Sequence, residues 1–288
     1  MSMYHGEALG WARIGDALEV TLHREPCNEI GTVALEDLER LADCLSSGAL
    51  GAQVMIMHSV CDAGFCAGAD LRELWEGLDA RQDRVKVVEE HAGRAAPLVE
   101  RVGGHLVKRE IRQFVDRVHA AFNAIDSAPI LTIAATHGVV FGGGFELALT
   151  CDLIVADRST RFCFPELRLG LVPGFGGIPR LRRDVGNAVV RDLLLTGRSL
   201  GAKRAHQLGI VSQLAGRGEA LTLARSLAEQ ASRFDEHTLR EGKAFAKPVP
   251  HAELEREKDL FCELVTRPKV FEALSDFVSR DDPYTYLP

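Results

Sequence analysis

The sequence has few of the features that mark secreted, membrane-spanning or metal-binding proteins. Its seven cysteines are scattered, with no C-x-x-C pair, so neither a disulfide framework nor a zinc site is predicted. The most apolar stretch, residues 129–150, contains three consecutive glycines and a glutamate, which a membrane helix would not usually carry. Residues 1–16 lack the basic and apolar regions of a secretory leader. We therefore expect a cytoplasmic protein that makes no use of a membrane.

An excess of positive charge is also absent. The 34 Lys and Arg residues are outnumbered by 41 Asp and Glu residues, which gives a net charge of −7 and no electrostatic reason to expect nucleic acid as a partner. The densest basic cluster is Arg180, Arg182 and Arg183. Because no aromatic residues are interleaved with it, we interpret this cluster as a solvated surface patch.

Short apolar segments alternate with helical ones in the first part of the chain. Residues 17–22, 53–58, 130–135 and 152–156 are short and apolar, a pattern typical of buried strands. Residues 33–45 place leucines on one helical face. Strands that alternate with helices predict an α/β fold with mostly parallel pairing.

The pattern changes near residue 200. Helical periodicity then dominates, over residues 219–234, 236–246, 251–265 and 268–279. Lys247-Pro248 and the following Pro250 should end a helix, because proline removes a hydrogen bond and restricts the residue before it. We expect a core over residues 1–200 and a helical region over 201–288.

A charged, helix-compatible stretch, about residues 71–125, interrupts the alternation. Pro97 and the pair Gly103-Gly104 predict that it is broken into two or three helices. It is either a surface insertion or a lid or pocket wall. His91, His105 and His119 lie in it and are expected at the surface.

Three consecutive glycines stand where a strand-like run meets a helical one. Gly142–Gly144 precede Phe145 and Glu146, an arrangement that leaves unpaired backbone N–H groups at a helix start, where the helix dipole also favours negative charge. A nucleotide-binding loop is disfavoured, because Lys and then Ser or Thr should follow its last glycine. Glu146 makes the segment a candidate for acid–base chemistry, although an isolated glutamate is more often a solvated or capping residue.

A second candidate, Glu166, follows a proline in the phrase Phe164-Pro165-Glu166. Its apolar neighbours predict partial burial, which raises the pKa of a carboxyl group and suits it to proton transfer near neutral pH. Two nearby carboxyl groups can divide acid and base duties when their environments differ.

A third element, GFCAGADL at 64–71, directly follows the second strand-like run. Its small residues allow a ligand to approach the backbone closely. Taken alone, it is a tight strand-to-helix connection in which Asp70 caps the helix.

Together, and in this order, the three elements resemble the signature of the crotonase superfamily of enoyl-CoA hydratases and isomerases. The phrases are FCAGADL at 65–71, GGGFELALTCDLIVA at 142–156 and FPELRLGLVPGFGG at 164–177. The resemblance implies an α/β spiral of ββα units with a helical C-terminal trimerisation region, assembled as a homotrimer or a dimer of trimers. It also implies an acyl-CoA substrate and no cofactor beyond the coenzyme A of that substrate.

The resemblance further implies roles for individual residues. The backbone N–H groups of Ala69 and Gly143 would form an oxyanion hole for the thioester. Glu166 would donate a proton to the α-carbon while Glu146 activates the water. Coenzyme A and the substrate would contact a set of small and apolar residues and one aspartate: Cys66, Ala67, Asp70, Leu71, Gly142, Pro173 and Gly174.

Retention of both glutamates favours syn addition of water to a 2-enoyl-CoA, or the reverse dehydration of a 3-hydroxyacyl-CoA. The stretch between Asp70 and Pro129 is longer than typical hydratases need, which leaves the acyl specificity open. The alternatives are an enoyl-CoA isomerase, an acyl-thioester dehydratase and hydrolase such as a diffusible-signal-factor synthase, and a non-catalytic acyl-CoA-binding subunit.

Overall fold

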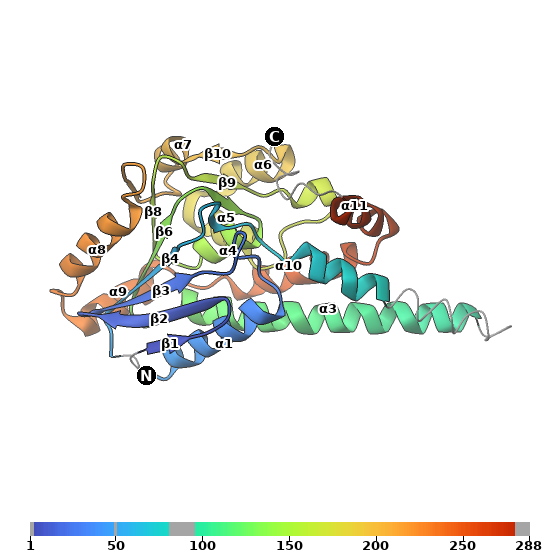
Figure 1. Ribbon diagram of the computed structural model, residues 1–288, viewed down its shortest axis with the longest axis horizontal. Coiled ribbons are helices and arrows are strands. Elements are labelled where there is room, and N and C mark those ends of the chain that lie inside the picture. Colours follow the sequence, from blue (N-terminus) through green and yellow to red (C-terminus); the bar gives the residue numbers. More distant parts are fainter. Residues whose placement is uncertain (1–2, 49–50, 81–95, 280–288) are drawn as a thin grey trace.

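Two β-sheets form the centre of the molecule, as Figure 1 shows. A computed structural model describes residues 3–48, 51–80 and 96–279. In spatial order the larger sheet contains β1 (Met3–His5), β2 (Leu9–Ile14), β3 (Ala17–Leu22), β4 (Val54–Ser59), β6 (Leu131–Thr136), β8 (Leu153–Ala156) and β11 (Gln213–Leu214). The smaller sheet contains β10 (Leu200–Gly201), β9 (Arg161–Cys163), β7 (Val139–Phe141) and β5 (Gly64–Cys66).

From β4 onward the chain visits the two sheets in turn. β4, β6 and β8 lie in the larger sheet, and β5, β7 and β9, which follow them in the chain, lie in the smaller one. Neighbours in each of these sets pair in parallel. Each pair of strands is followed by helix, so the chain advances as a spiral of ββα units. This confirms the predicted α/β fold, and the four predicted strands lie within one residue of β3, β4, β6 and β8.

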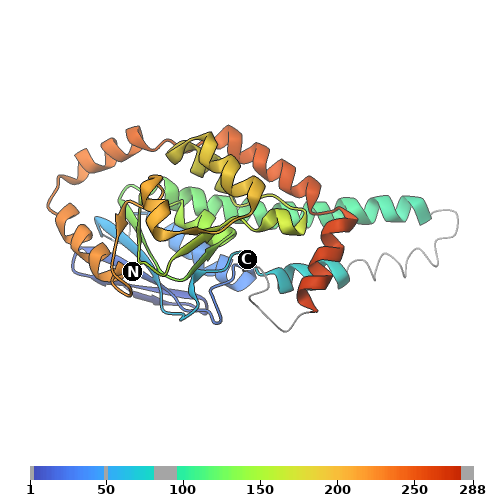
Figure 2. The ribbon, with the colours of Figure 1, turned by 90° about the horizontal axis from the view of Figure 1, so that it is seen from above.

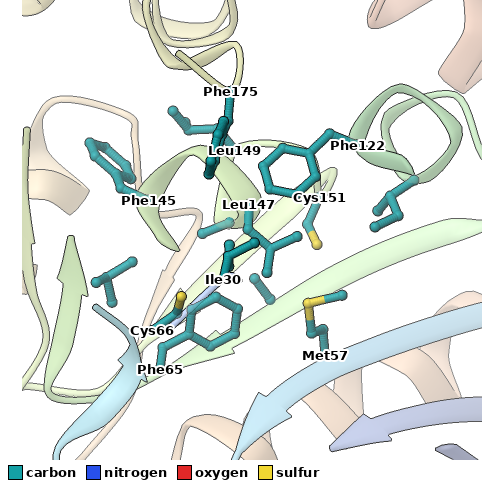
Figure 3. Packing of buried hydrophobic residues seen from close by; sticks show 14 of the residues in the cluster. Ile30, Met57, Phe65, Cys66, Phe122, Phe145, Leu147, Leu149, Cys151 and Phe175 are labelled. Carbon is teal, nitrogen blue, oxygen red and sulfur yellow. The ribbon is translucent and has the colours of Figure 1, made fainter. Parts of the chain in front are cut away.

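The central strands of the larger sheet, β4, β6 and β8, are buried on both faces, and their side chains alternate between two apolar clusters. Ile56, Ile133 and Val155 pack on one face against the alanines of α8 (Ala220–Ala231). Met57 points to the other face, where Figure 3 shows it near Phe65 of β5. Helices on both sides explain why these strands are continuously apolar rather than alternating with polar residues.

The helices α1 (Thr32–Ser46) and α3 (Ala96–Asp126) pack side by side along the molecule. The expected break at Gly103-Gly104 is wrong, since α3 runs through both glycines, whereas Pro97 lies at the start of α3, next to residues outside the described ranges. Pro97 is in the first turn, where its missing N–H has no helical partner to lose. Each glycine costs about 1 kcal/mol relative to alanine, which the packing of a long helix outweighs.

The remaining helices are short or lie in the C-terminal third of the chain. They are α4 (Gly143–Ala148), the 3-10 helix η2 (Glu166–Leu169), α5 (Gly177–Val185), α6 (Asn187–Thr196), α7 (Ala202–Gln207), α9 (Glu236–Ala246), α10 (His251–Leu264) and α11 (Pro268–Val278). The predicted helices after residue 200 are confirmed, and α9 ends just before Lys247-Pro248. The short strands β10 and β11 also lie in this region, so it is not entirely helical.

The last helix, α11, packs against a helical segment from an earlier part of the chain. In Figure 2, α11 crosses the helical segment 71–80. Trp75 of that segment packs on Phe271 of α11, with ring centroids 4.3 Å apart. Within the described ranges, no helix combines the length and apolarity needed to cross a membrane.

Candidate active site

The turn between β7 and α4 exposes the start of a helix. Gly142, the residue before α4, has φ 47°, in the left-handed region that favours glycine. A Cβ at this position would also lie 2.8 Å from Oε1 of Glu166. The next residue, Gly143, begins α4, and its N–H donates to no described residue. The glycine turn therefore presents a free amide next to a glutamate.

A second free amide lies close to the first. Ala69 follows β5, and its N–H also has no acceptor among the described residues. A Cβ on Gly143 would lie 3.4 Å from the nitrogen of Ala69, and one on Gly68 would lie 3.1 Å from the nitrogen of Gly143. The two amides thus border one small space, which only residues without side chains leave open.

Glu146 lies in the first turn of α4 and is 2% exposed. Its Oε1 accepts hydrogen bonds from the backbone N–H groups of Phe175, at 2.8 Å, and Gly177, at 2.7 Å. Burial raises the pKa of Glu146 to about 7, against the opposing effect of these hydrogen bonds. The carboxyl group is therefore able to gain or lose a proton near neutral pH.

Glu166 begins η2, directly after Pro165. Its Oε2 is enclosed and has no hydrogen-bond partner among the described residues. Burial, and then the nearby charge of Glu146, raise the pKa of Glu166 well above its usual range. Two amides of other residues stabilise the carboxylate of Glu146, whereas only the backbone of Glu166 itself opposes the rise in its pKa. A single proton shared between the two groups therefore resides preferentially on Glu166.

Both glutamates and both free amides line one pocket of about 990 Å³, counting the part open to solvent. Of the other residues expected to contact the substrate, Ala67, Leu71, Gly142 and Gly174 also line it. The wall is otherwise mostly apolar and includes Pro26, Cys27, Glu29, Gly68, Leu74, Val139, Phe141, Pro165, Leu169, Leu171, Phe175 and Phe261.

Three residues expected at the substrate do not line this pocket. Cys66 is fully buried, and its thiol donates to the carbonyl of Asn28. Pro173 is buried behind the wall. Asp70 accepts from the N–H of Glu73, as a helix cap does, and pairs with Arg24 at 2.7 Å.

The helical stretch after Asp70 contributes to the pocket rather than only to the surface. Leu71 and Leu74 line the pocket. A neighbouring cavity between segment 71–80 and α3 shares Ala69, Leu74, Phe175 and Phe261 with it. The two cavities therefore meet beside the free amide of Ala69.

The interpretation of the basic cluster as a solvated patch is wrong for two of its three members. Arg180 is fully buried and pairs with Asp126 at 2.7 Å, and the side chain of Arg183, which is 11% exposed, pairs with the same carboxylate at 3.0 Å. Only Arg182 is solvated, on the opposite side of α5. Because successive residues of a helix point to different sides, α5 buries the side chains of Arg180 and Arg183 and exposes that of Arg182.

His119 is a further correction, because it is 3% exposed rather than at the surface. Its Nε2 hydrogen bonds to the carbonyl of Gly174 at 2.8 Å. His91 lies outside the described residues, as does the side chain of His105.

Sequence reasoning also missed two residues next to Glu146. Phe175 lines the pocket and donates its N–H to Glu146, and Figure 3 shows its ring beside Phe122 of α3. Glu257 of α10 is 5% exposed and lies on the far side of the Phe175 loop.

Comparison with known proteins identifies the family of the chain. The model of the family described as "Enoyl-CoA hydratase/isomerase" matches residues 99–285, which is more than half of the chain. The chain belongs to this family, within the crotonase superfamily.

Named relatives and a solved structure agree. The chain is 32% identical over 197 residues to the enoyl-CoA isomerase/hydratase fer4 of Mycosarcoma maydis, covering 68% of this chain and 61% of that protein. It is 34% identical over 218 residues to the mitochondrial enoyl-CoA hydratase domain-containing protein 2 of Homo sapiens, covering 74% and 64%. The chain therefore spans less than two thirds of these relatives. A putative enoyl-CoA hydratase from Streptomyces avermitilis has the same fold, with a TM-score of 0.78 at 23% identity, covering 97% of this chain and 92% of that one.

Proposed function

We propose that the protein is an enoyl-CoA hydratase, which adds water to a 2-enoyl-CoA thioester or dehydrates a 3-hydroxyacyl-CoA. One observation carries the proposal: two buried carboxyl groups with different surroundings line the same pocket as two unpaired backbone amides. Addition of water to a conjugated thioester needs each of these parts, since charge develops on the carbonyl oxygen while one proton leaves water and another reaches carbon.

The two amides are the groups that hold the thioester. Its carbonyl oxygen would accept hydrogen bonds from the N–H groups of Ala69 and Gly143. When water adds to the β-carbon, electron density moves to this oxygen, and the amides stabilise the enolate by about 3 kcal/mol each. No reorganisation is needed, because both amides are fixed by backbone structure.

The two glutamates then divide the proton transfers. Glu146 is the group available to act as base, since two backbone donors stabilise its carboxylate and keep it ionised at a pH where Glu166 still holds its proton. It removes a proton from water while the water oxygen bonds to the β-carbon. Glu166, which retains its proton to higher pH, delivers that proton to the α-carbon. A proton must pass from Glu146 back to Glu166 before the next turnover.

The proposal extends to the ligand and the assembly. The substrate brings its own coenzyme A, so no further cofactor takes part. Its acyl chain would run from the amide of Ala69 toward the second cavity beside segment 71–80. We propose a homotrimer or a dimer of trimers, which light scattering at known subunit concentration distinguishes.

A panel of enoyl-CoA and 3-hydroxyacyl-CoA substrates, with products resolved by mass in ¹⁸O-labelled water, tests the reaction. Hydration predicts a product that carries one ¹⁸O atom at the β-carbon. A shifted double bond without ¹⁸O would instead indicate an isomerase, the activity that the name of fer4 includes. A free acid and coenzyme A would indicate a thioester hydrolase, and binding without turnover a non-catalytic subunit.

The roles of the glutamates are tested by Glu146→Gln and Glu166→Gln. Each should lower turnover by at least about a hundredfold, the usual contribution of a general acid or base. Coenzyme A affinity should change little. Glu253→Gln is the control, because Glu253 pairs with Arg182 at the surface, 3.3 Å away. Normal hydration by both pocket variants would refute the two-glutamate mechanism.

A further inference from the structure

The loop of residues 175–178 supplies the two amides that hold Glu146, and these are half of the four backbone N–H groups of the loop. The N–H groups of Phe175 and Gly177 point to Glu146, at 2.8 and 2.7 Å. Those of Gly176 and Ile178 point to a different carboxylate, Glu257 of α10. Four successive amides therefore alternate between two buried glutamates on opposite sides of the loop.

Glu257 binds the loop with both of its oxygens. Its Oε1 accepts from Gly176 at 2.7 Å, and its Oε2 accepts from Ile178 at 2.8 Å. The carbonyls of Phe175 and Gly176 accept from the Arg180 guanidinium at 3.0 and 3.3 Å. Amides and carbonyls of the loop are thus held from separate directions.

The Phe175 ring also anchors the loop by packing against Phe122, but this contact does not hold the backbone amides. None of its four N–H groups donates to a backbone acceptor in the described part of the chain. Gly176 has φ 102°, which favours glycine, and glycine is also the residue with the most conformational freedom to lose. A Cβ there would collide with the Arg180 guanidinium. Without an acceptor for the amides of Gly176 and Ile178, the intervening amide of Gly177 loses its fixed direction.

We propose that Glu257 is a positioning residue for the catalytic base: by fixing the amides of Gly176 and Ile178 from α10, it directs those of Phe175 and Gly177 onto Glu146. This inference rests on the proposed function only in treating Glu146 as the catalytic base. Glu257 does not line the substrate pocket. Its effect on the reaction is therefore exerted through the loop and Glu146.

The Glu257→Gln variant tests the structural claim independently of any reaction. Glutamine has the same shape but only one acceptor oxygen, so it holds at most one of the two amides. Amide hydrogen exchange, resolved to single residues, should accelerate at Phe175 and Gly177 as well as at Gly176 or Ile178. The amides of Phe175 and Gly177 do not bind Glu257. If the substitution only removed the bonds made by Glu257 itself, these two amides would stay protected from exchange. Glu253→Gln, in the exposed first turn of the same helix, should change none of them.

The same variant tests the functional claim. The kcat for enoyl-CoA hydration should fall roughly ten- to a hundredfold, as misplacement of a catalytic group commonly causes. The KM should change little, because the pocket wall is intact. Unaltered exchange at Phe175 and Gly177, or an unaltered kcat in an enzyme that hydrates enoyl-CoA, would overturn the inference. If exchange accelerates at Phe175 and Gly177 in the variant, but the wild-type protein turns over no acyl-CoA, only the proposed function is refuted.

Discussion

Replacing Glu146 by glutamine should stabilise the protein while it disables the reaction. Burial raises the pKa of Glu146 from 4.5 to about 7. Between these two pH values the folded protein binds the proton more tightly than the unfolded chain, so a rise in pH destabilises the fold. The difference of about 2.5 in pKa corresponds to about 3 kcal/mol. Both backbone bonds are accepted by the single atom Oε1, so the glutamine oxygen can keep both while the charge is removed.

Urea unfolding at pH 5 and pH 8, at one fixed protein concentration, measures the effect. Glu146→Gln should exceed the wild type by about 3 kcal/mol at pH 8. At pH 5 the difference should be less than about 1 kcal/mol, because this pH is well below the pKa of about 7 in the folded protein and only slightly above the unfolded value of 4.5. Glu253→Gln should stay within about 0.5 kcal/mol of the wild type at both pH values. A Glu146→Gln variant no more stable than the wild type at pH 8 would refute the reasoning.

Three further predictions concern the reaction and the core. The kcat/KM should fall as the pH drops below about 7, because Glu146 becomes protonated, and a pH profile without this acidic limb would contradict its role as base. Gly143→Ala places a methyl group 2.7 Å from the Phe175 ring and 3.4 Å from the nitrogen of Ala69, so turnover should fall about a hundredfold in a folded protein; unchanged turnover would argue against an oxyanion site there. Arg180→Met leaves the buried carboxylate of Asp126 with weaker compensation and should destabilise the fold by about 3 kcal/mol in urea unfolding; a loss below about 1 kcal/mol would show that the remaining cations suffice.

Much of the fold was predictable because its buried strands are apolar runs with clear ends. The strands 17–22 and 130–135 needed only composition and length to be recognised. The second strands of the ββα units were not recognised individually, because β5, β7 and β9 contain three residues each and three residues show no periodicity. Their existence followed only from the family resemblance.

The candidate site was predictable where a titratable side chain stands next to glycines in the sequence. Gly142 and Gly143 beside Glu146 mark a helix start that only small residues leave open. Glu257 has no such local signal, because it lies in the charged run Glu253–Asp259. Its spacing from Leu254 and Phe261, three residues before and four after, places it on the apolar face of α10, and this pattern could have identified it.

Arg180 was misjudged for a related reason. A run of arginines resembles a surface patch in composition, whereas a helix sends neighbouring residues to different sides. Its partner, Asp126, lies at the far end of α3, more than fifty residues earlier in the chain. Such a pairing depends on the tertiary fold and is not visible in a local pattern.

The most direct test is a crystal structure with an unreactive acyl-CoA thioester. The thioester oxygen should lie about 2.7–3.1 Å from the backbone nitrogens of both Ala69 and Gly143. The α- and β-carbons should lie between the carboxyl groups of Glu146 and Glu166. A thioester bound elsewhere, or one whose oxygen contacts neither amide, would contradict the proposed mechanism.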